Sequence, residues 1–300
     1  MKLSTDNTML AIILSLLAIV LFDLMGLIIK HLSDDYSAFE LSAWRNLFGL
    51  IPSFIALWSS RSWHQAGRQW KIRQWPLALL RGVYVTFAQV LFYFSLGQMA
   101  FATASTITYA NAFFMTALAV PMLGERVGLI RWSAVMLGFA GVMMVMGPGK
   151  ESFSLYALAP LGAAFLYALA GVSARQLDPE LSTPLVNLYS AVTAMIGAFL
   201  LTLVTSGFSP LASLSDLGWI IAMGGFGGTA VLLLVTAFRM TEQSNLAPFS
   251  YFGIPIAFVM GWGFFGEKPF GDLFPGAILI VASGLMVIWR ERRLTRSSLD

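Results

Sequence analysis

The chain contains no cysteine and only two histidines, His31 and His64, among its 300 residues. The lack of cysteine excludes a disulfide framework, a thiolate metal site and a cysteine nucleophile. The sequence also lacks an H-x-x-x-H pair and any carboxylate pair suited to metal binding or acid–base catalysis. We therefore expect neither a metal nor another cofactor, and we do not expect an enzyme.

Charged residues are also scarce in the sequence. Charged residues make up 11% of the chain and hydrophobic residues 58%, whereas about a quarter of a soluble domain is charged. The mean hydropathy is +0.77, and apolar runs near the ~20 residues that cross a bilayer recur along the chain. These values predict an all-α integral membrane protein without a soluble domain. Basic residues in short loops explain the net charge of +3 better than a nucleic-acid partner does.

Charge clusters and Gly/Pro turns divide the sequence into ten predicted transmembrane spans. The least obvious division is at Leu96–Met99, but one helix through it would greatly exceed the bilayer thickness. The first span is too long for a signal-peptide core. The predicted spans are 8–30, 37–58, 75–97, 100–123, 128–147, 153–175, 183–206, 215–239, 244–265 and 272–290.

The lysines and arginines predict the orientation of these spans. Most of them fall on the side that holds both termini, and only Lys30, Lys150 and Lys268 fall in loops on the other side. Because cytoplasmic loops are rich in Lys and Arg, we expect both termini in the cytoplasm and a location in a bacterial inner membrane. The bilayer and a small-molecule substrate are the expected partners, and one chain could act as a monomer.

Two stretches of the sequence look alike, 103–127 and 244–268. Tyr109 corresponds to Tyr251, and each stretch ends near a Gly-Glu pair. Five spans in each half would place the second half upside down relative to the first. The sequence thus predicts two inverted five-helix repeats around a central cavity.

The boundary between these repeats is expected in the loop after the fifth span. The first repeat would comprise residues 1–149, and the second would comprise 150–300 together with a short basic tail. An independent match supports this division, because Lys30-His31-Leu32 aligns with Arg175-Gln176-Leu177 in the corresponding part of the second half.

Ionisable residues within the spans are candidates for function, because each costs at least about 2.5 kcal/mol at the bilayer centre. Asp23 is the deepest and is expected to face the interior, where it could bind a cation, a proton or a neighbouring amide. Arg45 could line the cavity, pair with Glu40 or reach the outer interface. Arg81 could line the cavity or extend to the cytoplasmic surface.

Polar and aromatic side chains at mid-depth form a second group of candidates. A buried aromatic hydroxyl needs a polar partner, and the alternative for each residue is ordinary core packing. Asn187 and Tyr189 add polar groups in the seventh span. The predicted substrate-binding residues are Asp23, Arg81, Tyr84, Gln89, Thr106, Tyr109, Asn111, Phe113, Tyr167, Phe249, Tyr251 and Phe252.

Small residues predict where helices approach closely. Gly224 and Gly228 belong to a glycine-rich segment that lacks the Lys-Ser/Thr of a phosphate loop, so we expect helix packing there.

The ninth span combines small residues with proline. Gly253, Ala257 and Gly261 recur every four residues and form one smooth face. Pro248 and Pro255 interrupt the same span, either as a passive kink or as a break beside a substrate path.

The end of the fourth span and the fifth span resemble a known family. Pro121 precedes Gly-Glu-Arg at 124–126, and Trp132, Gly138 and Gly141 follow. This pattern resembles the EamA-type transporters of the drug/metabolite transporter superfamily.

The resemblance implies ten helices in two inverted repeats, cytoplasmic termini, and a central cavity lined mainly by helices 1, 3, 4, 6, 8 and 9. Members of the family move amino acids, nucleosides, sugars, cofactor precursors and drugs, mostly outward. The second half departs from the pattern, since Lys268 replaces Arg and Gly263 stands where the first half has proline.

We therefore expect a secondary transporter that exports small metabolites by alternating access, most plausibly aromatic or other apolar amino acids. Two alternatives stay open: an importer of a larger cofactor-like metabolite, and a membrane enzyme or sensor without transport. Proton coupling and uncoupled facilitation are both compatible with the sequence.

Overall fold

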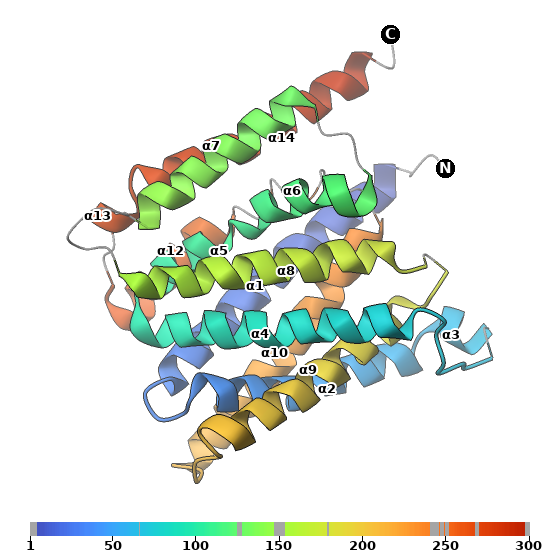
Figure 1. Ribbon diagram of the computed structural model, residues 1–300, viewed down its shortest axis with the longest axis vertical. Coiled ribbons are helices and arrows are strands. Elements are labelled where there is room, and N and C mark those ends of the chain that lie inside the picture. The colour runs from blue at the N-terminus through green and yellow to red at the C-terminus, as the bar shows by residue number, and fades with distance from the viewer. Residues whose placement is uncertain are drawn as a thin grey trace.

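The computed structural model describes residues 5–65, 67–124, 128–146, 154–178, 180–240, 246, 249, 252–267 and 270–297. Regular secondary structure in these ranges is helical throughout, with no strand (Figure 1). The helices are α1 Thr5–Leu32, α2 Ala38–Trp58, α3 Arg61–Gln65, α4 Trp75–Gln98, α5 Phe101–Thr108, α6 Asn111–Leu123, α7 Leu129–Met146, η1 Leu155–Ala157, α8 Leu158–Gln176, α9 Thr183–Thr205, α10 Leu214–Met240, α12 Gly253–Phe265, α13 Phe270–Leu273 and α14 Gly276–Ser297.

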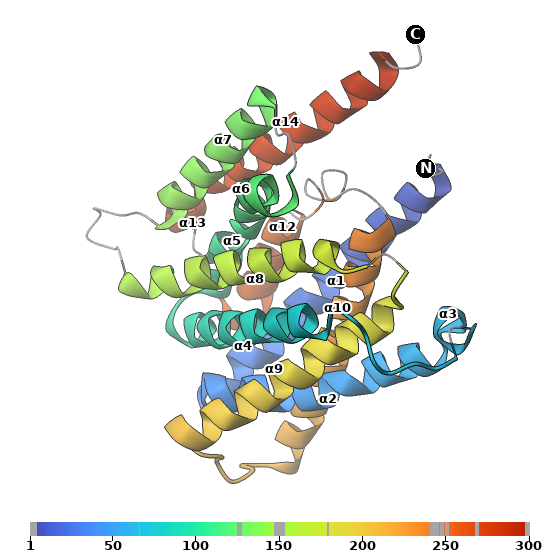
Figure 2. The same ribbon diagram turned by 45° about the vertical axis from the view of Figure 1, so that its right-hand side comes forward.

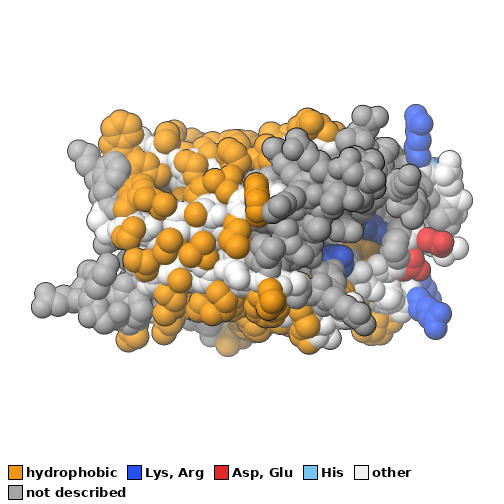
Figure 3. All heavy atoms as spheres, turned by 90° about the horizontal axis from the view of Figure 1, so that it is seen from above, with side chains coloured by type: hydrophobic (Ala, Val, Ile, Leu, Met, Phe, Trp, Pro, Cys, Tyr) orange, Lys and Arg blue, Asp and Glu red, His pale blue; other side chains and the backbone are white. Residues whose placement is uncertain are grey.

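Six helices of the described part are long and apolar enough to cross a membrane. They belong to α1, α4, α5 with α6, η1 with α8, α9 and α10. Trp132–Val145 in α7 and Gly253–Phe265 are shorter apolar helices, while α2 and α14 occupy the two remaining predicted spans. Figure 3 shows apolar side chains over the middle of the molecule and charged side chains gathered at one end. The chain is thus a multi-pass helical membrane protein.

The helices pack in pairs that join the two halves of the chain. α1 runs along α10, α4 runs along α8, and α2 packs against both α9 and α10. α7 and α14 form a further pair at one side of the bundle, as both ribbon views show (Figures 1 and 2). Elements from both halves therefore enclose the centre of the molecule.

Two helices end on a left-handed glycine. Gly124 follows α6 with φ of 67°, and Gly266 follows α12 with φ of 64°. Glycine adopts this conformation at a helix end without the steric cost of a side chain. Both helix ends predicted at the Gly-Glu pairs are confirmed, whereas Glu125 and Arg126 lie outside the described residues.

The predicted glycine packing is also confirmed. A β-carbon on Gly228 would lie 2.5 Å from the carbonyl oxygen of Gly49 and 2.8 Å from its Cα, so the backbones of α2 and α10 touch. The face of α12 formed by Gly253, Ala257 and Gly261 lies toward α5, because a β-carbon on Gly261 would lie 3.6 Å from Cβ of Phe101.

The span expected at 100–123 is not one continuous helix. It divides at Tyr109 and Ala110, where the Ala110 amide donates to the Ile107 carbonyl at 3.0 Å and the Ala112 amide to the Tyr109 carbonyl at 3.2 Å. These bonds span three residues instead of four, so the helix tightens locally. No glycine or proline marks this turn in the sequence, which is why it was not expected.

In the ninth span, Pro255 does not interrupt a helix. It lies in the first turn of α12, which begins at Gly253, and backbone amides in a first turn have no intrahelical acceptor to lose. Pro248 lies outside the described residues.

Candidate functional site

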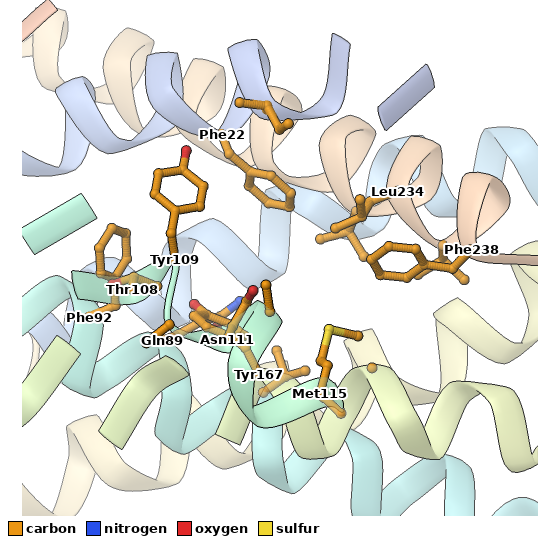
Figure 4. A pocket seen from close by; sticks show the side chains of 18 of the residues that line it. Phe22, Gln89, Phe92, Thr108, Tyr109, Asn111, Met115, Tyr167, Leu234 and Phe238 are labelled. Atoms are coloured by element: carbon orange, nitrogen blue, oxygen red, sulfur yellow. The ribbon is translucent and has the colours of Figure 1, made fainter. Parts of the chain in front are cut away.

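A cavity of about 540 Å³ lies at the centre of the molecule. Elements of both halves line it, among them α1, α2, α4, α6, α8, α9 and α10. Figure 4 shows part of this lining, with Tyr109 and Phe22 pointing into the same space and Leu234 and Phe238 at another side of it. Of the residues predicted from the sequence, the cavity brings together Asp23, Arg81, Gln89, Tyr109, Asn111, Phe113 and Tyr167.

The turn between α5 and α6 forms one wall of the cavity. All residues from Thr108 to Phe113 line it, because the tight turn exposes consecutive positions that a regular helix would distribute around its circumference. Tyr109 projects from this turn toward α1 in Figure 4, and its phenol contacts the backbone of Gly253, where a β-carbon would overlap it. The start of α12 thus fixes the orientation of Tyr109.

Asp23 is a buried carboxylate in the cavity wall. Its side chain is 5% exposed, and Oδ2 has no hydrogen-bond partner among the described residues. It lies near enough to Tyr109 for the two groups to interact electrostatically. An unpaired carboxylate at this depth is unfavourable unless a cation, a proton or a donor compensates it.

Arg45 belongs to a second group of polar side chains, which lie on α2 and α4. Its Nη1 donates to Asn46 Oδ1 at 2.9 Å, and its Nη2 donates to the Gly227 carbonyl at 2.8 Å. Asn46 Nδ2 in turn donates to Gln89 Oε1 at 2.7 Å, and Ser42 Oγ donates to the same oxygen at 3.1 Å. The chain of bonds holds the Arg45 guanidinium in a fixed position at the cavity.

Arg81 is held by the second half of the chain. Its Nε donates to the Ala170 carbonyl at 3.1 Å and its Nη1 to Ser190 Oγ at 2.8 Å. The Ser190 hydroxyl donates onward to the Ala78 carbonyl at 3.1 Å. Because Arg81 is only 5% exposed, it does not extend to the cytoplasmic surface. It lies in the cavity lining instead.

Neither buried arginine has an acidic partner in the part of the chain that the structure describes. Within the described ranges no carboxylate oxygen lies within 4 Å of Arg45 or Arg81. The alternative pairing of Arg45 with Glu40 is wrong, since Glu40 Oε1 accepts from the Ser209 amide at 3.0 Å and from Trp44 Nε1 at 3.5 Å. The described cavity wall therefore holds two buried arginines without a carboxylate partner there, the carboxylate of Asp23 and, at the end of α8, the exposed Arg175.

Other predicted site residues lie away from this lining. Tyr84 is half-buried on α4, Thr106 is fully buried in α5, and Phe252 is 53% exposed and stacks on Phe249 with ring centroids 6.3 Å apart. None of these four belongs to the cavity lining among the described residues. Tyr251 lies outside the described residues.

The cavity also includes polar residues that were not selected from the sequence. These are Asn46, Ser53 and Ser190. Asn187, which was named from the sequence, also lines the cavity, and its Nδ2 donates to Ser53 Oγ at 3.0 Å. Serine is common on small-residue packing faces of membrane helices, so its spacing alone gives no signal of a cavity. Asn46 was detectable in principle, as an amide directly after an intramembrane arginine.

An ion pair links several helices at one end of the bundle. Lys30 Nζ lies 3.0 Å from Glu267 Oε1 and donates to the carbonyls of Leu96 at 3.1 Å and Met99 at 2.8 Å. Glu267 Oε2 accepts from the backbone amide of Phe101 at 2.8 Å. Phe101 itself lines the cavity, so this network ties α1, α5 and the end of α12 together across the cavity's end.

The cavity extends toward the opposite end, where the N-terminus lies in Figure 1. Arg175 at the end of α8 and Phe238 near the end of α10 belong to its wall. Among the residues that the structure describes, no cluster of three or more His, Cys, Asp or Glu side chains could hold a metal ion. The site is thus a polar, aromatic-lined chamber suited to binding a small molecule by charge and shape.

Several known proteins that are similar to this chain are named exporters or transporters. The chain is 26% identical over 273 residues to the pseudopaline exporter CntI of Pseudomonas aeruginosa strain UCBPP-PA14, covering 91% of this chain and 93% of that protein. It is 23% identical over 267 residues to the S-adenosylmethionine uptake transporter of Rickettsia bellii, covering 88% of each. A riboflavin transporter of Vibrio cholerae is 30% identical over 183 residues, which is 58% of each chain.

The fold has a counterpart among solved structures. A crystal structure superposes with a TM-score of 0.69 over 95% of this chain and 98% of the other, at 19% sequence identity. The model of the EamA-like transporter family matches residues 9–147 and 154–289. With its helical membrane fold and central chamber, the chain belongs to the EamA-like transporter family and is a transporter rather than an enzyme.

Proposed function

We propose that this protein is a secondary transporter of a bacterial inner membrane that exports small, amino-acid-like metabolites by alternating access. The observation that carries the proposal is the central chamber, where Asp23 and the arginines Arg45 and Arg81 lack partners of opposite charge among the described residues. A substrate with both an amino and a carboxyl group would compensate charges of both signs. Aromatic residues such as Phe22, Phe92 and Phe113 offer contacts for an apolar side chain, as in an aromatic or other apolar amino acid.

An inverted-repeat architecture of ten helices, with halves 1–149 and 150–300, would explain how the chamber changes sides. The packing supports it. In this architecture α1 corresponds to α8 and α4 to α10, so the α1–α10 contact and the α8–α4 contact are equivalent, and both are present. The two separate family matches, 9–147 and 154–289, divide the chain at nearly the same place. The left-handed glycines Gly124 and Gly266 end corresponding helices.

Alternating access requires that the chamber be closed on one side at a time. The pair of Lys30 and Glu267 closes one end, and the chamber extends toward Arg175 at the other. With the termini in the cytoplasm, as the Lys and Arg distribution favours, the closed end would face outward. This conformation is then the one that loads substrate from the cytoplasm, as export requires. A single copy suffices, since one chain forms the whole chamber.

The decisive test is transport by the purified protein in liposomes. Vesicles loaded with labelled phenylalanine, leucine or another amino acid should lose the label faster than vesicles without protein. Absence of protein-dependent flux for a panel of amino acids and their derivatives would overturn the proposal. Equal flux with and without a pH gradient would rule out proton coupling, and dependence on the gradient would point to proton exchange at Asp23.

The named uptake activity of the Rickettsia relative makes import of a larger metabolite the second candidate. Cells that express the chain distinguish the two directions. Faster efflux from preloaded cells supports export, whereas accumulation of external label supports import.

A further inference from the structure

Two arginines of the chamber wall, Arg45 and Arg81, are buried and keep N–H groups that the described part of the protein does not use. Arg45 uses one N–H of Nη1 and one of Nη2, which leaves a second N–H on each of these nitrogens, while its Nε is buried beside Gly227. Arg81 uses Nε and Nη1 on Ala170 and Ser190, and its Nη2 makes no hydrogen bond within the described part of the chain. Each guanidinium is therefore fixed in place and retains a donor for an anionic group.

The two guanidiniums are held at separate points along the wall. Arg81 binds Ser190 on α9, whereas Asn46, the partner of Arg45, contacts the Ala194 carbonyl at 3.4 Å. Ser190 and Ala194 are one helical turn apart, about 6 Å along α9. Each guanidinium thus has its own set of anchoring contacts on the protein and can bind a carboxylate of its own.

The carboxylate of Asp23 is on a different helix, near Tyr109 and the turn between α5 and α6. Apart from the exposed Arg175 at the end of α8, the charged groups of the described lining therefore mark three buried points: two cationic on the side of α2, α4 and α9, and one anionic on α1. A neutral amino acid with one carboxylate and one ammonium would leave one arginine uncompensated.

We propose that the substrate is an amino-acid-derived metabolite with a net negative charge, which carries at least two carboxylates and one amino group. Its carboxylates bind Arg45 and Arg81, its ammonium binds Asp23, and its apolar part lies against the aromatic lining. This assignment rests on the proposed transport function and narrows its substrate class from amino acids in general to anionic derivatives.

A matched series of probes tests the charge requirement. L-Phenylalanine is neutral overall, N-(carboxymethyl)-L-phenylalanine has one additional carboxylate, and L-phenylalaninamide lacks the carboxylate altogether. Binding to the full-length protein is measured by thermal stabilisation in detergent, and flux is measured in liposomes by mass spectrometry. The dicarboxylate should bind at least tenfold more tightly than phenylalanine, and the amide should bind weakest. Equal or tighter binding of phenylalanine would overturn the assignment.

Variants of the charged residues locate the effect. Arg45→Gln and Arg81→Gln should each reduce the preference for the dicarboxylate over phenylalanine at least fivefold. Asp23→Asn should weaken binding of both probes while it preserves that preference. Arg73→Gln, an exposed arginine in the loop before α4, serves as the matched control and should behave as wild type. An unchanged preference in both chamber variants would contradict the assignment.

If Arg81→Gln fails to fold, Arg81→Lys provides a second test. It keeps the positive charge but lacks the forked guanidinium that binds Ser190 and Ala170. It should retain a preference for the dicarboxylate that is intermediate between wild type and Arg81→Gln. If no probe of the series or of the amino-acid panel binds or moves, the proposed function itself fails. If phenylalanine moves and the dicarboxylate has no advantage, transport stands and the anionic substrate class is wrong.

Discussion

The phenol of Tyr109 occupies the place beside Gly253 where a β-carbon would otherwise lie. Tyr109 belongs to the tight turn that divides α5 from α6, and Gly253 is the first residue of α12. The contact joins corresponding regions of the two halves at the wall of the chamber. Glycine is required at 253 by this close approach and not by its backbone conformation, since its φ is not among the positive values.

Gly253→Ala should therefore displace the Tyr109 ring and reduce transport several-fold. Overpacking of this kind costs about 1–3 kcal/mol, so thermal stability in detergent should also fall. Gly263→Ala on the same helix is the control, because a β-carbon there meets no atom within 4 Å. Adding Tyr109→Phe to Gly253→Ala removes the overlapping hydroxyl and should restore part of the stability. Wild-type flux and stability in Gly253→Ala would show that the contact with Gly253 does not constrain Tyr109.

The position of the chamber predicts unequal effects of two tyrosines. Tyr109→Ala removes a side chain from the cavity wall, so flux in liposomes should fall at least tenfold while the folded yield stays measurable. Tyr84→Ala removes the same atoms from a residue outside the lining, so this variant should retain most of the wild-type flux. The reverse order of effects would place the substrate path elsewhere.

The ion pair of Lys30 and Glu267 should control exposure of the chamber at the closed end. Both side chains are largely buried, with 16% and 17% exposed. If the pair contributes about 1 kcal/mol to the closed state, Glu267→Gln should raise the population open at that end about fivefold. The absence of cysteine from the chain allows Ser105→Cys in the chamber wall to report this change as the rate of labelling by a membrane-impermeant thiol reagent.

The double variant Lys30→Glu with Glu267→Lys is the control for the ion pair. It restores the attraction between the two side chains, but neither the bond that Glu267 accepts from the Phe101 amide nor the bonds that Lys30 donates to the Leu96 and Met99 carbonyls. Its labelling rate should therefore fall between wild type and Glu267→Gln. A rate in Glu267→Gln equal to that of the wild-type background would show that other contacts keep this end closed.

The contact between α2 and α10 should tolerate no side chain at Gly228. A β-carbon there would lie 2.5 Å from the Gly49 carbonyl oxygen, and backbone atoms cannot move aside as a flexible side chain can. Gly228→Ala should lower the thermal stability in detergent by an amount equivalent to about 1–3 kcal/mol. Gly225→Ala on the same helix has open space around it and should be neutral or slightly stabilising. Similar stabilities of the two variants would contradict the close packing.

The sequence predicted the membrane class, the helices and the two Gly-Glu helix ends because these depend on local properties. Long apolar runs require helices in a bilayer, where each backbone group must be satisfied within the span. A glycine after an apolar run can adopt the left-handed conformation that ends a helix. Asp23 and Arg81 were found for a similar reason, since an intramembrane charge is costly wherever the helix packs.

The composition of the chamber was less predictable. Tyr84 lies only three residues after Arg81 on α4, yet it is outside the lining, because which face meets the centre is decided by how α4 packs on α8 and α9. Asn46 and Ser190 line the chamber only because α2 and α9 bring them to the arginines.

By itself, then, the amino-acid sequence determined that this chain folds as membrane helices, where several of them end, and which charges are placed at depth. Only the tertiary structure decided that Arg45 turns to Asn46 and Gly227 instead of Glu40, that the helix breaks at Tyr109, and that Lys30 meets Glu267. The physical reason is the range of the interactions. Helix formation and its cost in a bilayer depend on neighbours along the chain, whereas partners of buried charges are chosen by contacts between helices far apart in sequence.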